Sequence, residues 1–274
     1  MKVSRIAGAL GAEISGIELS ADLSPATVAE LRQIWLEHLV LFFHDQNLPP
    51  ARLLALARRF GEPMDYPFLK GLDDFPQVTT VAKLEHETVN FGGIWHSDTT
   101  YLPQPPSATL LIAREVPPQG GDTLFANQYL AYETLSAGLR RLLEGLHAVS
   151  SSANADASKT REDRIRESGK NDVAEEFTTT HPVLRTHPET GRKSLYVNPA
   201  HTVRFEGMTD EESAPLLQLL FRHQVRAEFT CRFSWRIGSL ALWDNRCALH
   251  NPVNDYQGYR RIMHRITLKG DVPC

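Results

Sequence analysis

The sequence has few cysteines and no long apolar run. Its three cysteines, at positions 231, 247 and 274, are odd in number and lack a Cys-x-x-Cys spacing. This argues against a disulfide framework and a structural zinc site, and it favours a reducing compartment. No stretch approaches the ~20 apolar residues of a membrane span, and the apolar run at 6–12 is too short for a signal peptide. We therefore expect a cytoplasmic protein with no membrane partner.

The chain also lacks an excess of positive charge. Its 29 Lys and Arg residues face 33 Asp and Glu residues, which gives a net charge of −4. That balance argues against a nucleic-acid partner, so any bound anion must be held by a local cluster of cations. The 274 residues are 42% hydrophobic, enough to bury a full core. With no repeat or linker visible, we expect a single domain over residues 1–274.

The first sixty residues alternate between helix and strand patterns. Ser24 followed by Pro25 is a helix start signal. Apolar residues then recur at helical spacing at Val28, Leu31, Trp35 and Leu39. The apolar run 39–43 predicts a buried strand. The pair Pro49-Pro50 predicts a second helix with Leu53, Leu56 and Phe60 on its inner side.

From about residue 95 the pattern changes to short strands separated by Gly, Pro and Asn. Examples are 107–114, 194–198 and 240–243. Residues 148–180 are poor in large aliphatic side chains and predict a mobile insertion or lid. Thr209 and Glu212 form a capping-box pattern before a helix. Its predicted buried stripe is Leu216, Leu217, Leu220 and Phe221.

The most informative segment contains His96, Ser97 and Asp98. In a strand, side chains two residues apart project to the same side, so His96 and Asp98 could reach one metal ion while Ser97 points away. One histidine and one carboxylate are two of the three ligands of a facial triad, which holds iron(II) and leaves other positions open. The pattern alone is weak evidence, because short patterns recur by chance. A second histidine is required.

The chain has eleven histidines, so the third ligand must be chosen by context. His44 adjoins Asp45 in a strand-like run, which sends the pair to opposite faces and favours a structural role. His181 and His187 lie in a Pro-flanked loop segment and are also expected to be structural. His250 follows an apolar strand and precedes a segment with two arginines. It is therefore the candidate ligand.

Residues 261–268 alternate as a strand does. Arg261 and Arg265 share one face, roughly 13 Å apart at ~3.3 Å per residue. The opposite face, which includes His264, reads as the core side. Two arginines on one face could hold two anions at separate points, or they could form surface salt bridges of little consequence. Periodicity alone favours neither interpretation.

Together these segments resemble the taurine dioxygenase-like family of iron(II)- and 2-oxoglutarate-dependent oxygenases, which includes alkylsulfatases and phenoxyacetate dioxygenases. The resemblance covers nearly the whole chain. Its most specific stretches are Trp95-His96-Ser97-Asp98-Thr99-Thr100-Tyr101, Gly120-Gly121-Asp122-Thr123, Val197-Asn198, Trp243-Asp244-Asn245-Arg246 with His250, and Arg260-Arg261-Ile262-Met263-His264-Arg265.

The resemblance implies a role for each matched residue. The implied iron(II) ligands are His96, Asp98 and His250. Arg261 and Thr123 match residues that contact 2-oxoglutarate, and Arg265 matches the arginine that holds the acidic group of the prime substrate. The implied reaction is hydroxylation by O₂, coupled to conversion of 2-oxoglutarate to succinate and CO₂. The implied fold is α+β but mainly β, a distorted double-stranded β-helix (a cupin-like jelly roll) with outer helices.

The substrate positions depart from the taurine enzymes. Tyr66 and Leu69 stand where those enzymes carry a His and a Tyr, and Gly92 stands where they carry an Asn. Together with Phe91 and Tyr101, these residues suggest a more apolar pocket, although core packing would also explain each aromatic. The departures disfavour taurine.

Three functional interpretations follow. The first is a dioxygenase acting on a small anionic sulfonate or alkyl sulfate. The second is an aryloxyalkanoate dioxygenase of the same family. The third, of another class, is a noncatalytic metal-binding jelly-roll module, which the cosubstrate arginine argues against. We also expect a homo-oligomer, either a dimer or a tetramer.

Overall fold

The computed structural model describes residues 1–66, 69–153 and 176–274. A nine-stranded sheet forms its largest layer, and all strand pairs in it are antiparallel except β2 with β3. The order is β1 (Lys2–Arg5), β2 (Ala12–Ser15), β3 (Val40–Phe43), β15 (Leu240–Asp244), β7 (Ala108–Glu115), β17 (Arg261–Leu268), β6 (Phe75–Lys83) and β5 (Gly71–Leu72), with β4 (Pro63–Met64) beside β17.

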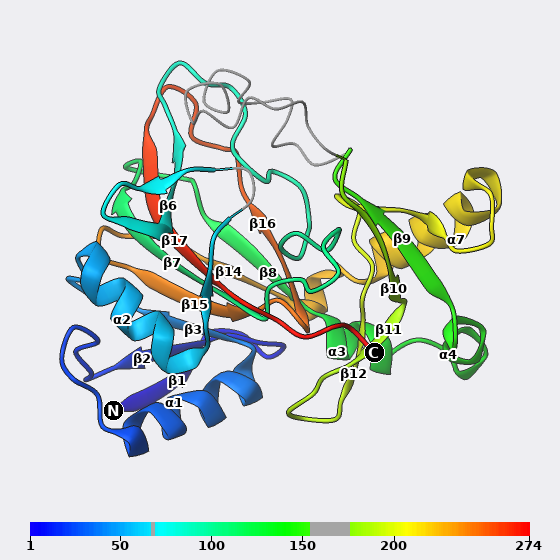
Figure 1. The fold of residues 1–274 in the computed structure, drawn as a ribbon, viewed down its shortest axis with the longest axis horizontal. Helices are drawn as coiled ribbons and strands as arrows, with labels where there is room; N and C mark the ends of the chain where they lie inside the picture. The colour runs from blue at the N-terminus through cyan, green and yellow to red at the C-terminus, as the bar shows by residue number, and fades with distance from the viewer. Residues whose placement is uncertain (67–68, 154–175) are drawn as a thin grey trace.

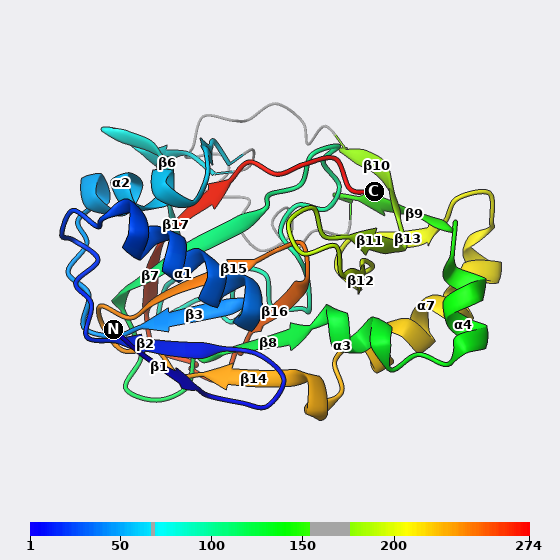
Figure 2. The same ribbon diagram turned by 90° about the horizontal axis from the view of Figure 1, so that it is seen from below.

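A second sheet lies against the first, as Figure 2 shows. Its order is β14 (Thr230–Phe233), β8 (Thr123–Asn127) and β16 (Ala248–Pro252). Aromatic side chains fill the space between the sheets, and Phe42 stacks on Phe233 with ring centroids 4.1 Å apart. The two facing sheets confirm the expected mainly-β jelly roll.

Two helices, α1 (Pro25–His38) and α2 (Pro50–Phe60), cover the outer face of the large sheet (Figure 1). Ser24 caps α1 by accepting a hydrogen bond from the backbone N–H of Thr27. Helix α1 packs on β3 and β15 and helix α2 on β6 and β17, so that Trp35, Leu53 and Leu268 belong to one core cluster. Both predicted helices are confirmed. Within the described residues, no helix is long and apolar enough to cross a membrane.

The third part of the molecule is a lobe beside the two sheets (Figure 1). It contains α3 (Gln128–Glu133), α4 (Ala137–Leu143), β9 (His147–Ser151), β10 (Thr178–Pro182), β11 (Leu184–Thr186), β12 (Lys193–Leu195), β13 (Thr202–Phe205), α7 (Asp210–His223) and the 3₁₀ turn η1 (Ala227–Phe229). The capping box of α7 is present, and Leu217 and Leu220 are its fully buried apolar residues.

Two predictions, the insertion at 148–180 and the buried face of 261–268, need correction. The expected insertion 148–180 was wrong at its ends, because β9 and β10 pair there and Ala148 is buried in the lobe's core. The centre of that insertion, 154–175, lies outside the described residues. In β17, the predicted core face is confirmed at Ile266 and Leu268, which lie in the core under the helices, but His264 is only half-buried, and Arg261 and Arg265 on the opposite face are also buried. The arginine face of β17 points between the two sheets, where apolar and polar groups from both layers cover it.

Candidate active site

Three side chains from distant parts of the sequence meet between the sheets. His96 forms a one-residue bridge to His250 on β16, with backbone hydrogen bonds of 3.0 and 2.8 Å. Oδ1 of Asp98 lies 3.9 Å from Nε2 of His96 and 3.8 Å from Nε2 of His250. Separations of this size can be spanned by one ion with metal–ligand bonds of about 2.0–2.2 Å. All three side chains are buried.

The route by which the chain brings Asp98 to this point differs from the prediction. His96 is only an isolated bridge residue and Asp98 lies in a turn, so the expectation of a regular strand was wrong. A side-chain hydrogen bond, rather than strand pairing, holds this turn in place: the hydroxyl of Ser97 donates to the carbonyl oxygen of Asn245 at 2.6 Å. The side chains of His96 and Asp98 nevertheless reach the same point.

The two oxygens of Asp98 have different surroundings. Oδ2 accepts hydrogen bonds from the hydroxyl of Thr109, at 2.5 Å, and from the amide of Asn245, at 3.2 Å. Oδ1 faces the two histidines. Burial alone would raise the pKa of Asp98, but the nearby His250 and Arg265 outweigh it and lower the pKa to about 2. The carboxylate is therefore ionised and offers one oxygen to a metal.

The histidines are also prepared as neutral ligands. Nδ1 of His96 lies 2.7 Å from the carbonyl oxygen of Ile94, and a proton held there leaves the lone pair on Nε2 directed at the site. Burial, aided by His96, lowers the pKa of His250 well below its ordinary value. Two imidazole nitrogens and one carboxylate oxygen form a donor set that fits Fe(II) and similar divalent metals.

One cavity beside the triad holds the cationic groups. It is lined by Val81, Phe91, His96, Leu111, Thr123, Trp243, His250, Pro252, Arg261 and Arg265. Arg261 and Arg265 are 6% and 5% exposed, so the surface salt-bridge interpretation was wrong. Two nitrogens of each guanidinium have no hydrogen-bond partner among the described residues. Buried unpaired donors of this kind fit an anionic ligand, as the 2-oxoglutarate expectation requires.

Arg265 lines this cavity and also lies against Tyr66 and Phe91, which line a second one. Its guanidinium carbon lies 4.0 Å from the ring centroid of Tyr66 and 5.7 Å from that of Phe91, and Nη1 lies 3.7 Å from Oδ1 of Asp98. Burial disfavours its charge, but Tyr66 and Asp98 outweigh that effect and raise the pKa of Arg265. The two arginines therefore line one cavity rather than two separate sites.

The second cavity is mainly apolar. It is lined by Tyr66, Phe91, Gly92, Ile94, His96, Asp98, Thr99, Tyr101, Ala200 and His201. The structure thus places three of the four predicted pocket residues here, whereas Leu69 lines neither cavity at the triad. Gly92 has φ +71°, and a Cβ added there would lie 2.9 Å from Cε1 of His96. A side chain at position 92 would therefore crowd the His96 ring in this backbone conformation.

Sequence reasoning missed His201, which lies in this second cavity. Its Nδ1 is 2.9 Å from the hydroxyl of Thr100, and its backbone N–H donates to Asn198. Burial, with His96 nearby, lowers the pKa of His201 to about 3, so the imidazole is neutral. The Val197-Asn198 motif had pointed to this loop, but no spacing rule connected residue 201 to the triad.

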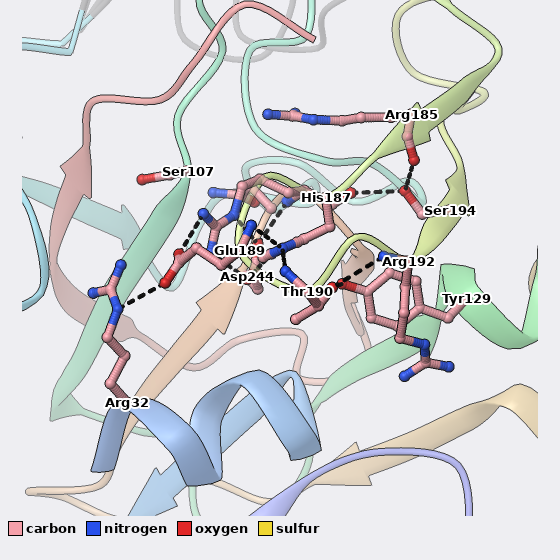
Figure 3. A network of polar contacts seen from close by, with 12 residues as sticks. Arg32, Ser107, Tyr129, Arg185, His187, Glu189, Thr190, Arg192, Ser194 and Asp244 are labelled. Atoms are coloured by element: carbon pink, nitrogen blue, oxygen red, sulfur yellow. Dashed lines mark hydrogen bonds and ion pairs between the residues drawn. The ribbon is translucent and has the colours of Figure 1, made fainter. Parts of the chain in front are cut away.

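A buried polar network holds the turn between β15 and β16 (Figure 3). Asp244 accepts hydrogen bonds from Arg246, at 2.8 and 2.7 Å, and lies 3.0 Å from Nε2 of His187. Arg246 also binds Glu189, which binds Arg32 of α1. The network therefore fixes the turn that carries the Asp98 partner Asn245 and leads to His250.

The three histidines that were expected to be structural are held by hydrogen bonds, and one of them, His187, belongs to this network. His187 and Asp244 lie near Cys247 in a metal-like cluster. However, Nδ1 of His187 accepts two backbone N–H groups and both oxygens of Asp244 are hydrogen-bonded, so no ligand atom is spare. His44 lies against Ser239 and Phe233, and His181 against the carbonyl of Leu102. All three have the structural surroundings that were expected.

Comparison with known proteins agrees with this geometry. The chain is 35% identical to an alpha-ketoglutarate-dependent sulfate ester dioxygenase of Pseudomonas putida, over 100% of this chain and 91% of that protein. It is 34% identical to an alkylsulfatase of Acinetobacter baylyi, over 99% and 86%. Alpha-ketoglutarate is 2-oxoglutarate. The protein is thus a metal- and 2-oxoglutarate-dependent dioxygenase, an oxidoreductase.

The family follows from the same comparisons. Residues 2–267 match the family described as "Taurine catabolism dioxygenase TauD, TfdA family", and the chain belongs to it. The structure resembles a taurine dioxygenase of Burkholderia xenovorans with a TM-score of 0.84 and 36% identity, covering 99% of this chain and 92% of that one. It also resembles AAD-2 in complex with Mn(II) and N-oxalylglycine, with a TM-score of 0.81 and 27% identity, covering 99% and 98%.

Proposed function

We propose that the protein uses Fe(II), held by His96, Asp98 and His250, to hydroxylate a small anionic organic substrate of the sulfate ester or sulfonate class. Bound Fe(II) and 2-oxoglutarate would supply the oxidation by O₂, with release of succinate and CO₂. The observation that carries the proposal is the meeting of two cavities at the triad, one lined by buried cations and one mainly apolar.

The protein's own groups have separate tasks in this proposal. Arg261 and Thr123 bind and orient the cosubstrate, because a planar guanidinium fixes the orientation of a carboxylate as well as its charge. Arg265, at the junction of the cavities, binds the acidic group of the substrate. The aromatic walls at Tyr66, Phe91 and Tyr101 exclude water and hold the organic part.

The identity of the substrate class rests on the pocket and on the relatives. Gly92 and the aromatic walls leave an apolar space beside one buried cation, which suits an alkyl sulfate or a longer sulfonate. The same aromatic walls favour an aryloxyalkanoate as the second candidate, and one relative at 32% identity is an (S)-phenoxypropionate dioxygenase. A noncatalytic metal module would not need two buried arginines that each keep two nitrogens without a hydrogen-bond partner among the described residues.

The test is a substrate panel of alkyl sulfates, sulfonates and aryloxy acids, with Fe(II) and 2-oxoglutarate present. We expect succinate release to be stimulated by an alkyl sulfate, with one sulfate and one aldehyde formed per succinate. Stimulation by aryloxy acids alone, with release of a phenol, would favour the second candidate. Protein that binds metal but releases no succinate with any panel member would contradict the proposal.

A further inference from the structure

Lys83, the last residue of β6, has an ammonium group with no counter-ion among residues 1–66, 69–153 and 176–274. The residue is 2% exposed, and its Nζ has neither a hydrogen-bond acceptor nor a salt-bridge partner in the part of the chain that is described. Nζ lies 4.6 Å from the ring centroid of Tyr256. A buried unpaired ammonium is costly, and a cation–π contact offsets only part of that cost. The position therefore calls for an explanation.

The neighbour of Lys83 across the sheet is Arg261. The two residues are Cα partners in the pairing of β6 with β17, so their side chains lie on the same face of the sheet. Like charges directly opposite each other destabilise a sheet. Arg261 is itself buried, and its Nε and Nη2 have no hydrogen-bond partner among the residues described.

The acidic groups nearby do not neutralise this pair. Asp122 favours the charged form of Arg261, but its carboxylate is bound to Arg232 at 2.5 Å. Tyr256 lies below Lys83 and also favours the charge on Arg261. Within the described residues, these two adjacent buried cations thus share one phenol and have no carboxylate of their own. Such a site is stabilised when an anion enters the adjoining cavity.

We propose that Lys83 is the second cation of the cosubstrate anchor, which strengthens the hold of Arg261 on the far carboxylate of 2-oxoglutarate and so selects a dicarboxylate over a monocarboxylate 2-oxo acid. The proposal rests on the 2-oxoglutarate site described above. Lys83 does not line the cavity, so it acts through its charge and through Arg261. It is a positioning residue, and its substitution should not alter the binding of metal.

The test measures equilibrium binding rather than turnover. Protein loaded with Mn(II) is titrated with 2-oxoglutarate and, separately, with 2-oxopentanoate, which lacks the far carboxylate. In Lys83→Met, which removes the charge and leaves an unbranched side chain of similar length, the Kd for 2-oxoglutarate should rise at least tenfold. The Kd for 2-oxopentanoate should stay within twofold. Lys2→Met, at an exposed position, is the matched control and should change neither value.

The melting temperature of the ligand-free protein gives a second readout. If the charge of Lys83 is uncompensated, Lys83→Met should melt higher than the wild type without ligand and gain less from 2-oxoglutarate. The proposal would be overturned if Lys83→Met changed the Kd values of both ligands by the same factor, so that their ratio stayed as in the wild type. If the Met variant is unfolded by circular dichroism, Lys83→Gln is measured against the same criteria.

A separate variant distinguishes failure of this inference from failure of the cosubstrate assignment. Arg261→Met should lose most of the preference for 2-oxoglutarate over 2-oxopentanoate. If Arg261→Met keeps that preference, the cosubstrate site itself is misassigned. If Arg261→Met loses the preference but Lys83→Met keeps it, the cosubstrate site is correctly assigned and the proposed role of Lys83 is wrong.

Discussion

At the scale of single residues, the most important feature of the site is that the two oxygens of Asp98 have different partners. Thr109 and Asn245 hydrogen-bond to Oδ2, while Oδ1 is left facing His96 and His250. Groups that orient a metal ligand influence metal affinity almost as strongly as the ligand does. Neither Thr109 nor Asn245 belongs to the His-x-Asp pattern, so only the folded chain reveals their part.

Thr109→Val removes the shorter of these two hydrogen bonds while nearly keeping the volume of the side chain. We expect metal affinity to fall about tenfold, at the lower end of the 10–100-fold range for outer ligand partners. Competition of Mn(II) with a coloured chelator measures this directly. Thr88→Val, at an exposed position, is the control. Equal affinity in Thr109→Val and wild type would show that Thr109 does not orient the ligand.

Substitution of the two arginines should change different Michaelis constants in steady-state kinetics. Arg261→Met should raise the KM for 2-oxoglutarate at least tenfold, because a buried charged hydrogen bond is lost. Arg265→Met should raise the KM for the prime substrate and leave 2-oxoglutarate binding largely intact. The reverse pattern would mean that the two roles are exchanged. The shared cavity makes this outcome informative, since position alone does not assign the roles.

At the scale of elements, the turn between β15 and β16 connects the fold to the site. Arg246 is 4% exposed and binds both Asp244 and Glu189. Arg246→Met would leave the carboxylate of Asp244 buried and short of its main counter-charge. Breaking one partner of a buried ion pair costs about 3–5 kcal/mol. Urea unfolding should show that loss, and a change below about 1 kcal/mol would contradict it.

The strand β17 carries a pH-sensitive group away from the triad. Burial, with Arg114 beside it, lowers the pKa of His264 to about 4 from its ordinary 6.5. The unfolded chain therefore binds more protons than the folded chain between these values. The stability contributed by neutral His264 is complete above about pH 6.5 and is lost as the pH falls toward about 4.

His264→Gln should therefore weaken the dependence of unfolding free energy on pH in this window. The measurement is urea unfolding of the variant and the wild type at several values between about pH 5 and pH 7. The wild type should lose stability more steeply as the pH falls. Parallel curves for the two proteins would contradict the assigned pKa.

Elements with local signals were predictable from the sequence. Ser24 and the capping box at Thr209 predict where α1 and α7 begin, because capping depends on residues that are close in the sequence. The two ends of the region 148–180 were misjudged, since β9 owes its place to pairing with β10 and β13 rather than to its own composition. The burial of the arginine face of β17 was missed for a related reason. An arginine face can be buried when both sheets supply its surroundings.

At the scale of the whole molecule, the site lies where the two sheets face each other. β16 of the small sheet supplies His250, β17 of the large sheet supplies both arginines, and the loop before β7 supplies His96 and Asp98. The order of motifs along the chain predicted this convergence through the family resemblance. The two cavities, with His201 in one and Lys83 behind the other, depend on packing across layers and have no signature in sequence spacing.

The proposed function requires that one Fe(II), bound by His96, Asp98 and His250, shares its site with 2-oxoglutarate. Its most direct test is an anaerobic titration of the metal-free protein with Fe(II) in the presence of 2-oxoglutarate, followed by visible absorption. A metal-to-ligand charge-transfer band should appear and saturate at about one iron per chain, as a single triad requires, and it should be lost in Asp98→Ala. No band in the wild type, or an undiminished band in Asp98→Ala, would contradict the account.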